Sequence, residues 1–430
     1  MTPRKLAFDL LQRLEKNSQF SNIALDRALL KEEMNDADKG LVSALFYGVT
    51  ERRITLDYNI SLLSSRPINE IDSETLTALR LGIYQLAYMD RIPPHAAINE
   101  TVDLCKRRSS GFVNALLRSF TRADGLKFPD KSADPILYLS VKYSVCPQLA
   151  RRLADTFGEE QAEALLSGFD RIPETTVSVN TLKITRKELA EKISGATPTS
   201  VAPTGLRIKG SVRELYGFDD GLFFVQDEAS QICVAALDAK KGEHVLDICA
   251  CPGSKTFGAA ISMKNEGRIQ AFDLHKKKLP LITSGAERLG ISIISVAERD
   301  GRDYLEELDG VADRIICDVP CSGFGVLLKK PELRYKDPAE SNALPDIQLG
   351  ILKNASRYLK VGGTLVYSTC TIFPEENEEN IKRFLSENSS FELTPFSVGD
   401  TAFPEGYTTL YPHKNGTDGF FIARLTRKHI

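Results

Sequence analysis

The second half of the chain alternates between short apolar runs and helical patterns, and this rhythm restricts the possible folds more than any other feature. Strand-like apolar runs separated by segments of helical spacing occur at residues 245–248, 268–273, 291–296, 313–318 and 364–367. Such alternation predicts a doubly wound, mostly parallel, Rossmann-like sheet with right-handed crossovers, which we expect to have seven strands. A late apolar run at 419–425 is predicted to form a strand that pairs antiparallel at the edge of this sheet.

The first part of the chain has a helical pattern from residue 3 to about residue 122. Leu6, Leu10, Leu11 and Leu14 fall on one stripe, and Gly111 is predicted to open the last helix. Residues 123–133 are polar and rich in turn formers, which indicates a linker. We therefore predict a multidomain chain made of an all-α domain (1–125), a small α+β linking region (134–225) and an α/β domain (226–430).

Composition excludes several classes of protein. No apolar stretch approaches the roughly 20 residues of a membrane span, and Asp9 comes too early for the core of a signal peptide. Eight cysteines without regular spacing do not indicate a disulfide framework, so we expect a reduced, cytoplasmic protein. A net charge of −3 is not the bulk signature of a nucleic-acid binder.

The turn after the first strand of the α/β domain predicts a cofactor site. Gly253 lets a ligand approach the backbone closely, and the next helix offers free N–H groups. The dinucleotide glycine pattern is missing, and Cys249 and Ser254 replace the glycines of a phosphate-binding loop. Acids follow the next strands, and an acid for ribose without a phosphate cradle favours S-adenosylmethionine. The predicted cofactor residues are Cys249, Ala250, Cys251, Pro252, Gly253, Ser254, Lys255, Asp273, Asp300 and Asp318.

Two cysteines stand at the ends of the fourth and fifth strands, Cys321 in DVPCSG (318–323) and Cys370 in YSTCT (367–371). Neighbouring strands lie about 5 Å apart, so both thiols should face one pocket. A lone cysteine is more often buried filler. A pair at the carboxyl edge of the sheet instead suggests covalent attack on a ring that is hard to alkylate. These residues leave open which thiol attacks.

The motifs resemble those of RNA 5-methylcytosine methyltransferases. The similarity includes VLDICACPGSKT (245–256), the two cysteine motifs, KPELRY (330–335) and PEENE (374–378). Flanking segments at 226–230 and 416–421 also match, and GFVNALLR (111–118) is similar to a NusB-type RNA-binding domain. Together they resemble the bacterial 16S ribosomal-RNA cytosine-5 methyltransferase B family. Cys251 and Ser254 depart from the family pattern, which usually has alanine and glycine there.

This resemblance implies methylation of carbon 5 of a cytosine in 16S ribosomal RNA, on an unassembled or partly assembled small subunit, by a monomer. It assigns nucleophilic attack to Cys370 and product release to Cys321. Attack at carbon 6 turns the ring into an enamine, and a carboxyl group that protonates ring nitrogen 3 would assist it. Asp318, on the fourth strand, is the candidate for that proton transfer.

Three alternatives stay open. The same chemistry could act on transfer RNA. An amino-methyltransferase is disfavoured because it needs no thiol and leaves Cys370 unexplained. A non-catalytic RNA-binding or antitermination factor is disfavoured by the retained cysteines and cofactor acids. Lys329, Lys330 and Arg334 are candidates to hold the RNA backbone, with surface solvation an equal alternative.

Overall fold

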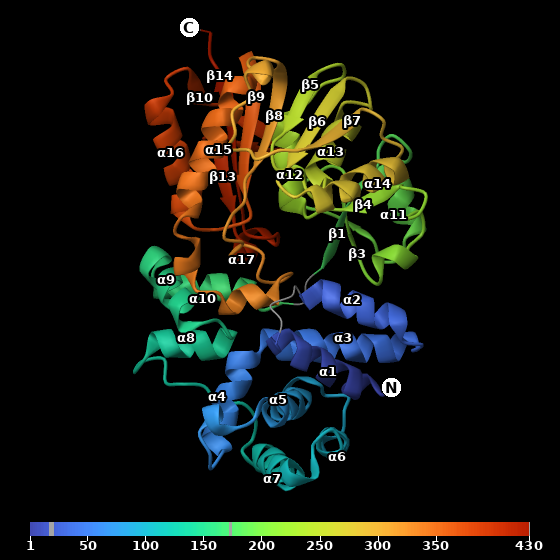
Figure 1. Cartoon of the computed structure of the whole chain (residues 1–430), viewed down its shortest axis with the longest axis vertical. Coiled ribbons are helices and arrows are strands. Elements are labelled where there is room, and N and C mark those ends of the chain that lie inside the picture. The colour runs from blue at the N-terminus through green and yellow to red at the C-terminus, as the bar shows by residue number, and fades with distance from the viewer. Residues whose placement is uncertain (17–20, 172–173, 430) are drawn as a thin grey trace. The chain divides into compact units, whose positions relative to one another are not determined.

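The computed structural model describes residues 1–16, 21–171 and 174–429, which form two compact units (Figure 1). The first unit contains residues 1–170 and a later segment, 327–338. The second contains residues 171–326 and 339–430. The chain therefore leaves the second unit just after the fourth parallel strand and returns twelve residues later. Within the described residues, no helix is both long and apolar enough to cross a membrane.

The first unit is helical, as its apolar periodicity predicts. In α7 (Arg107–Arg122), the side chains of Val113, Leu116, Leu117 and Phe120 recur on one face and are all buried. Gly111 lies inside this helix rather than at its start, because the amides of Ser109 and Ser110 already bond the Lys106 carbonyl. The other helices are α1 (Pro3–Lys16), α2 (Ser21–Lys31), α3 (Asp36–Glu51), α4 (Arg53–Leu63), α5 (Ser73–Tyr88), α6 (Pro94–Val102), α8 (Pro135–Tyr143), α9 (Pro147–Phe157) and α10 (Glu159–Gly168).

The region predicted as one linking segment, 134–225, is divided between the two units. Helix α8 packs on α4, where Thr55 Oγ1 donates to the Val141 carbonyl at 2.5 Å. Later residues bond the α/β domain instead, as when Asn180 Nδ2 donates to the Leu289 carbonyl at 2.9 Å. That later part forms its own sheet in the order β2-β3-β1-β4 with helix α11 (Arg186–Lys192). Its strands are β1 (Thr175–Val179), β2 (Thr197–Pro198), β3 (Gly205–Ile208) and β4 (Phe223–Val225).

The main sheet confirms the predicted fold class. Its order is β10-β14-β9-β8-β5-β6-β7, and neighbours from β9 to β7 run parallel. Strand β14 pairs antiparallel with β9 but is not an edge strand, because β10 and β13 pair with its other side. The sheet thus has eight strands rather than seven. They are β5 (His244–Asp247), β6 (Arg268–Asp273), β7 (Ile294–Glu298), β8 (Ala312–Asp318), β9 (Leu359–Thr369), β10 (Phe391–Leu393), β13 (Tyr407–Leu410) and β14 (Phe420–Arg427).

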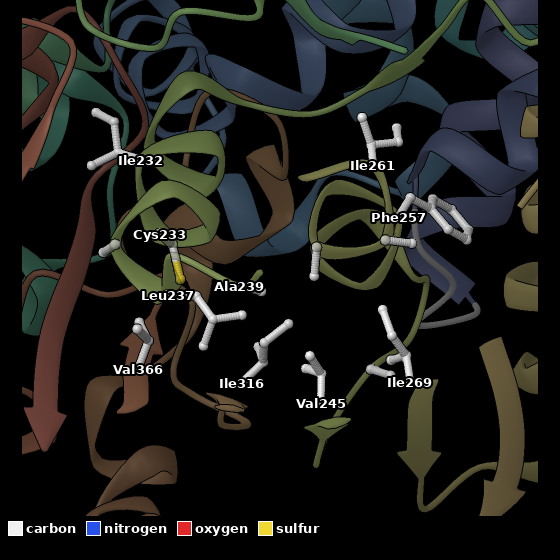
Figure 2. Close-up of a cluster of buried hydrophobic side chains, with 14 of the residues drawn as sticks. Ile232, Cys233, Leu237, Ala239, Val245, Phe257, Ile261, Ile269, Ile316 and Val366 are labelled. Carbon is white, nitrogen blue, oxygen red and sulfur yellow. The ribbon is translucent and has the colours of Figure 1, made fainter. Parts of the chain in front are cut away.

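Helices bury both faces of this sheet, which explains why its parallel strands are continuously apolar. On one face, Val245, Ile269 and Ile316 pack with side chains of α12 (Glu228–Leu237) and α13 (Ser254–Ser262), as Figure 2 shows. On the other, Leu246 and Ile315 pack with α15 and α16. The remaining elements of the domain are α14 (Leu279–Leu289), α15 (Leu344–Tyr358), α16 (Glu378–Glu387), α17 (Pro412–Asn415), β11 (Phe396–Val398) and β12 (Thr401–Phe403).

Candidate active site

The turn between β5 and α13 forms a tight backbone cradle. The Ala250 amide donates to the Phe272 carbonyl at 2.7 Å, which ties the turn to β6, and the Gly253 amide closes it on the Ala250 carbonyl at 2.7 Å. Gly253 has φ +108°, and a Cβ there would lie 2.7 Å from Phe257 Cζ. Only glycine fits this backbone without strain. No side chain caps the N-terminus of α13, so its first amides can bind a ligand.

The two predicted ribose acids lie at neighbouring strand ends. Asp273 ends β6, and its carboxylate accepts the Cys251 amide at 3.1 Å and the His275 amide at 2.9 Å. The structure thus places this acid directly against the cradle. Asp300 follows β7, whose residue Glu298 pairs with Asp273. Its carboxylate bonds the Arg302 guanidinium, which lowers the pKa of Asp300.

Asp247 belongs to the same region and is absent from the sequence prediction. It is the last residue of β5 and only 1% exposed. Thr256 Oγ1 donates to its Oδ2 at 2.6 Å, whereas Oδ1 has no hydrogen-bond partner among the residues that the structure describes. Burial raises the pKa of Asp247 to about 7. A buried carboxylate oxygen without a donor is costly, which indicates that a ligand supplies one. Its place directly before the glycine turn is the sequence signal that could have identified it.

Asp318 at the end of β8 is held on both carboxylate oxygens. Lys255 Nζ donates to Oδ2 at 2.7 Å, and Ser368 Oγ donates to Oδ1 at 2.7 Å. Burial lowers the pKa of the Lys255 ammonium, but the charge and hydrogen bond of Asp318, together with the nearby Cys233 and Cys370, outweigh burial and raise that pKa. Lys255 was predicted as a cofactor residue from its place in the turn. In the structure its ammonium group bonds Asp318, another residue of the predicted site.

The two strand-end thiols lie in direct contact. The Sγ atoms of Cys321 and Cys370 are 2.9 Å apart, and the Cys370 amide donates to the Cys321 sulfur at 3.2 Å. Parallel pairing of β8 with β9 brings them together, since Asp318 is in register with Ser368. The two thiols therefore meet at adjacent strand ends, while their opening into one pocket stays a prediction.

The contact between these thiols makes Cys321 hard to ionise. Its hydrogen bond with Cys370, together with burial, raises the pKa of Cys321 well above its ordinary value. The negative charges of Glu376 and Asp318 raise the pKa of Cys321 further.

Comparisons with known proteins agree with this geometry. A family model described as 16S rRNA methyltransferase RsmB/F matches residues 234–426, and the NusB family model matches residues 1–122. The chain is 37% identical to the probable ribosomal RNA small subunit methyltransferase B of Bacillus subtilis, over 99% of this chain and 98% of that one. The chain belongs to the ribosomal RNA small subunit methyltransferase B family. It is an S-adenosylmethionine-dependent ribosomal-RNA methyltransferase, which confirms the predicted cofactor and family.

Other relatives support the same assignment over the full length. The ribosomal RNA small subunit methyltransferase B of Escherichia coli K12 is 32% identical over 97% of this chain and 96% of its own. Among solved structures, that of the protein PH0851 superposes with a TM-score of 0.81 at 28% identity and covers 99% of both chains. The resemblance therefore includes the helical region as well as the α/β domain of the methyltransferase B fold.

Cys251 and Ser254 are the two positions predicted to depart from the family pattern, and the structure gives a role to the Cys251 side chain alone. Cys251 precedes Pro252 in the cradle, where burial and the nearby Asp273 raise the pKa of its thiol to about 12. A thiol that stays protonated is not a nucleophile, so Cys251 serves as packing beside the carboxylate. Ser254 begins α13, and its carbonyl accepts Gln226 Nε2 at 3.0 Å. Nothing in the structure explains its side chain.

Three loops pack against one another next to the thiols. They carry Gly325, Cys370 and Gly419, and their backbones are too close for a side chain at Gly325. The Gly325 amide donates to the Cys370 carbonyl at 2.9 Å, and the Gly419 amide donates to the Gly325 carbonyl at 2.8 Å. A Cβ on Gly325 would lie 1.9 Å from the Gly419 carbonyl oxygen. The family's late GTDGF segment therefore supports both cysteine loops, which its sequence position alone does not reveal.

The prediction that Arg334 holds the RNA backbone is wrong. Arg334 is 2% exposed and lies within the helical unit, where its guanidinium donates to the carbonyls of Tyr143 at 2.8 Å and Phe169 at 2.7 Å. The next residue, Tyr335, accepts the Arg53 amide at 3.1 Å. These bonds anchor the segment 327–338 in the first unit. Lys330 is exposed, as an RNA contact requires, but this exposure does not distinguish it from a solvated lysine.

Proposed function

We propose that this protein methylates carbon 5 of a cytosine in 16S ribosomal RNA through a covalent cysteine–cytosine adduct. The observation that carries the proposal is the contact between Cys321 and Cys370, 2.9 Å apart at adjacent strand ends. Methyl transfer to an amino group or a hydroxyl needs no thiol. Carbon 5 of cytosine needs a thiolate to activate the ring and a base to release it, and two adjacent thiols suit these two roles.

The residues suggest an order of proton movements. Cys370 Sγ bonds carbon 6, and ring nitrogen 3 takes a proton from the Lys255–Asp318 pair, in which Asp318 reaches the ring. Once the Cys370 sulfur is used in a covalent bond, it no longer raises the pKa of Cys321 by charge or hydrogen bonding. After carbon 5 has received the methyl group, Cys321 can ionise by releasing its proton to water and then accept the proton from carbon 5. Loss of that proton breaks the Cys370–carbon 6 bond, ring nitrogen 3 returns its proton to the Lys255–Asp318 pair, and the product is freed.

The cofactor residues are proposed from the fit of the region around the cradle. S-adenosylmethionine supplies the methyl group from a sulfonium and also carries an ammonium group. The unpartnered Asp247 Oδ1 suits that ammonium, and Asp273 and Asp300 suit the ribose and base. The cradle residues that we propose around it are Cys249, Ala250, Cys251, Pro252, Gly253, Ser254 and Lys255.

The RNA must present an unstacked cytosine, because a thiol can reach carbon 6 only from a ring face. We propose that the helical domain (1–125) and the linking region (134–225) bind 16S RNA before or during assembly of the small subunit, with the protein acting as a monomer. Transfer RNA is the alternative substrate, and the NusB-family match of residues 1–122 favours ribosomal RNA over it.

The loss of hydrogen from carbon 5 provides a direct test. We expect the purified protein, given S-adenosylmethionine and 16S RNA transcribed with [5-³H]cytidine, to release one tritium into water for each methyl group transferred. Transfer RNA labelled in the same way should release little. Methyl transfer with tritium retained would instead indicate an amino-methyltransferase. Tritium release from transfer RNA alone would show that transfer RNA, and not 16S RNA, is the substrate.

A further inference from the structure

A buried carboxylate connects the two cysteine loops from behind. Glu376 lies in a short 3-10 turn (Pro374–Glu376) and is 2% exposed. Its Oε2 accepts the Ser322 amide at 2.9 Å and Gln348 Nε2 at 2.8 Å, and its Oε1 accepts the Ser322 hydroxyl at 2.5 Å. No ion pair to Glu376 occurs in the described part of the chain. Burying a carboxylate without an ion pair costs free energy, and the hydrogen bonds to Glu376 offset that cost.

These contacts hold both neighbours of Cys321. Ser322 follows this cysteine, and Pro320 precedes it. Gln348 Nε2 donates to the Pro320 carbonyl at 3.0 Å as well as to Glu376. The backbone on each side of Cys321 is therefore fixed by the same pair of side chains.

The network also reaches the Cys370 loop. Ser322 Oγ lies 2.9 Å from the hydroxyl oxygen of Thr371, the residue after Cys370. The Tyr367 hydroxyl, on the strand that leads to Cys370, donates to the Glu376 carbonyl at 2.7 Å. Glu376 thus bonds the Cys321 loop directly, and the Ser322 hydroxyl links its carboxylate to the Cys370 loop.

We propose that Glu376 is a positioning residue that sets the distance between the Cys321 and Cys370 sulfurs and so controls product release. Its carboxylate is buried and bonds Ser322, so it acts through the neighbouring Cys321. The release role rests on the proposed function. The positioning of the thiols does not, and it can be tested without RNA.

The first test measures thiol geometry. Phenylarsine oxide joins two close thiols: two S–H bonds break, two As–S bonds form and the oxygen leaves as water. Arsenical bound by the protein but not by its C370A variant reports this pair. We expect E376A to bind the arsenical roughly tenfold or more weakly, because thiols that have moved apart no longer bind one arsenic atom together with a high effective concentration. E376Q should bind normally, since an amide can accept from Ser322 N–H and donate to its hydroxyl.

The second test measures turnover. We expect E376A to lower steady-state methylation about a hundredfold, the scale for a group displaced by 1 Å. The KM for S-adenosylmethionine should not change, and a denaturation-stable RNA adduct should accumulate. In a C321A background, E376A should change the adduct level no further. The control is Glu379→Ala, on the exposed side of α16, which should behave as wild type.

The outcomes separate the claims. E376A matching Glu379→Ala in both tests would overturn the inference, and so would an additive loss in the C321A background. Altered arsenical binding without tritium release from any RNA would overturn the proposed function and the release role while leaving the positioning of the thiols supported. Should E376A not fold, Ser322→Ala breaks the link to Thr371 and carries the same expectations.

Discussion

Replacing Cys370 by alanine should abolish methyl transfer and leave no covalent complex with RNA, whereas replacing Cys321 by alanine should trap one. Cys370 is the proposed nucleophile, whereas the hydrogen bond between the thiols raises the pKa of Cys321 and keeps that thiol protonated. Without the nucleophile, we expect a loss of about 10⁴-fold or more. Without Cys321, the methylated adduct still forms but the carbon 5 proton has no acceptor.

A denaturing gel with labelled 16S RNA distinguishes the two variants, since a covalent adduct migrates with the protein. Cys105→Ala is the matched control, because Cys105 lies in the helical unit. It should retain activity and show no trapped RNA. A trapped complex in Cys370→Ala and none in Cys321→Ala would reverse the two roles.

Replacing Asp247 by asparagine should stabilise the free protein at neutral pH and weaken its cofactor binding. The pKa of Asp247 is raised to about 7 by burial, so between pH 4 and pH 7 the unfolded chain loses a proton that the folded chain retains. The free energy of unfolding therefore falls with rising pH, by about 4 kcal/mol for a shift of this size, and levels off above pH 7. Asparagine cannot ionise and removes this slope.

Binding of S-adenosylmethionine should show the opposite dependence on pH. Its ammonium group favours the ionised form of Asp247, so the affinity of the wild type should increase from pH 6 to pH 8. Asp247→Asn should bind more weakly, by roughly tenfold or more, with no such increase. Urea unfolding and calorimetric titration at both pH values measure the two effects. The exposed Asp400→Asn serves as control. Equal pH slopes in the wild type and Asp247→Asn would contradict the assignment.

The sequence predicts most of the fold, because its apolar patterns show which elements are buried. Helices bury one face, whereas the parallel strands are buried on both faces and are therefore continuously apolar. Residues 268–273 form strand β6 as predicted, and the parallel direction of the strands follows from the alternation with helices. Long-range pairing is harder to predict. The short strand β13 carries no distinct pattern, yet it adds to β14 and removes the expected edge.

The site was predictable where function depends on residue type and position along a strand. Cys321 and Cys370 follow two strands that are neighbours in the usual sheet order, and Asp318 ends one of these strands, so their side chains come close together. Glu376 and Arg334 could not be placed in this way. Each is a charged residue in a polar segment, and its burial depends on partners such as Ser322 and Tyr143 that only the tertiary structure provides.

Bisulfite sequencing of 16S RNA from a strain lacking this gene tests the central claim most directly. We predict that one cytosine protected in the parent becomes unprotected in the deletion strain. Protection should return with the intact gene and not with the Cys370→Ala variant. A full complement of 5-methylcytosine in 16S RNA from the deletion strain would contradict the assignment.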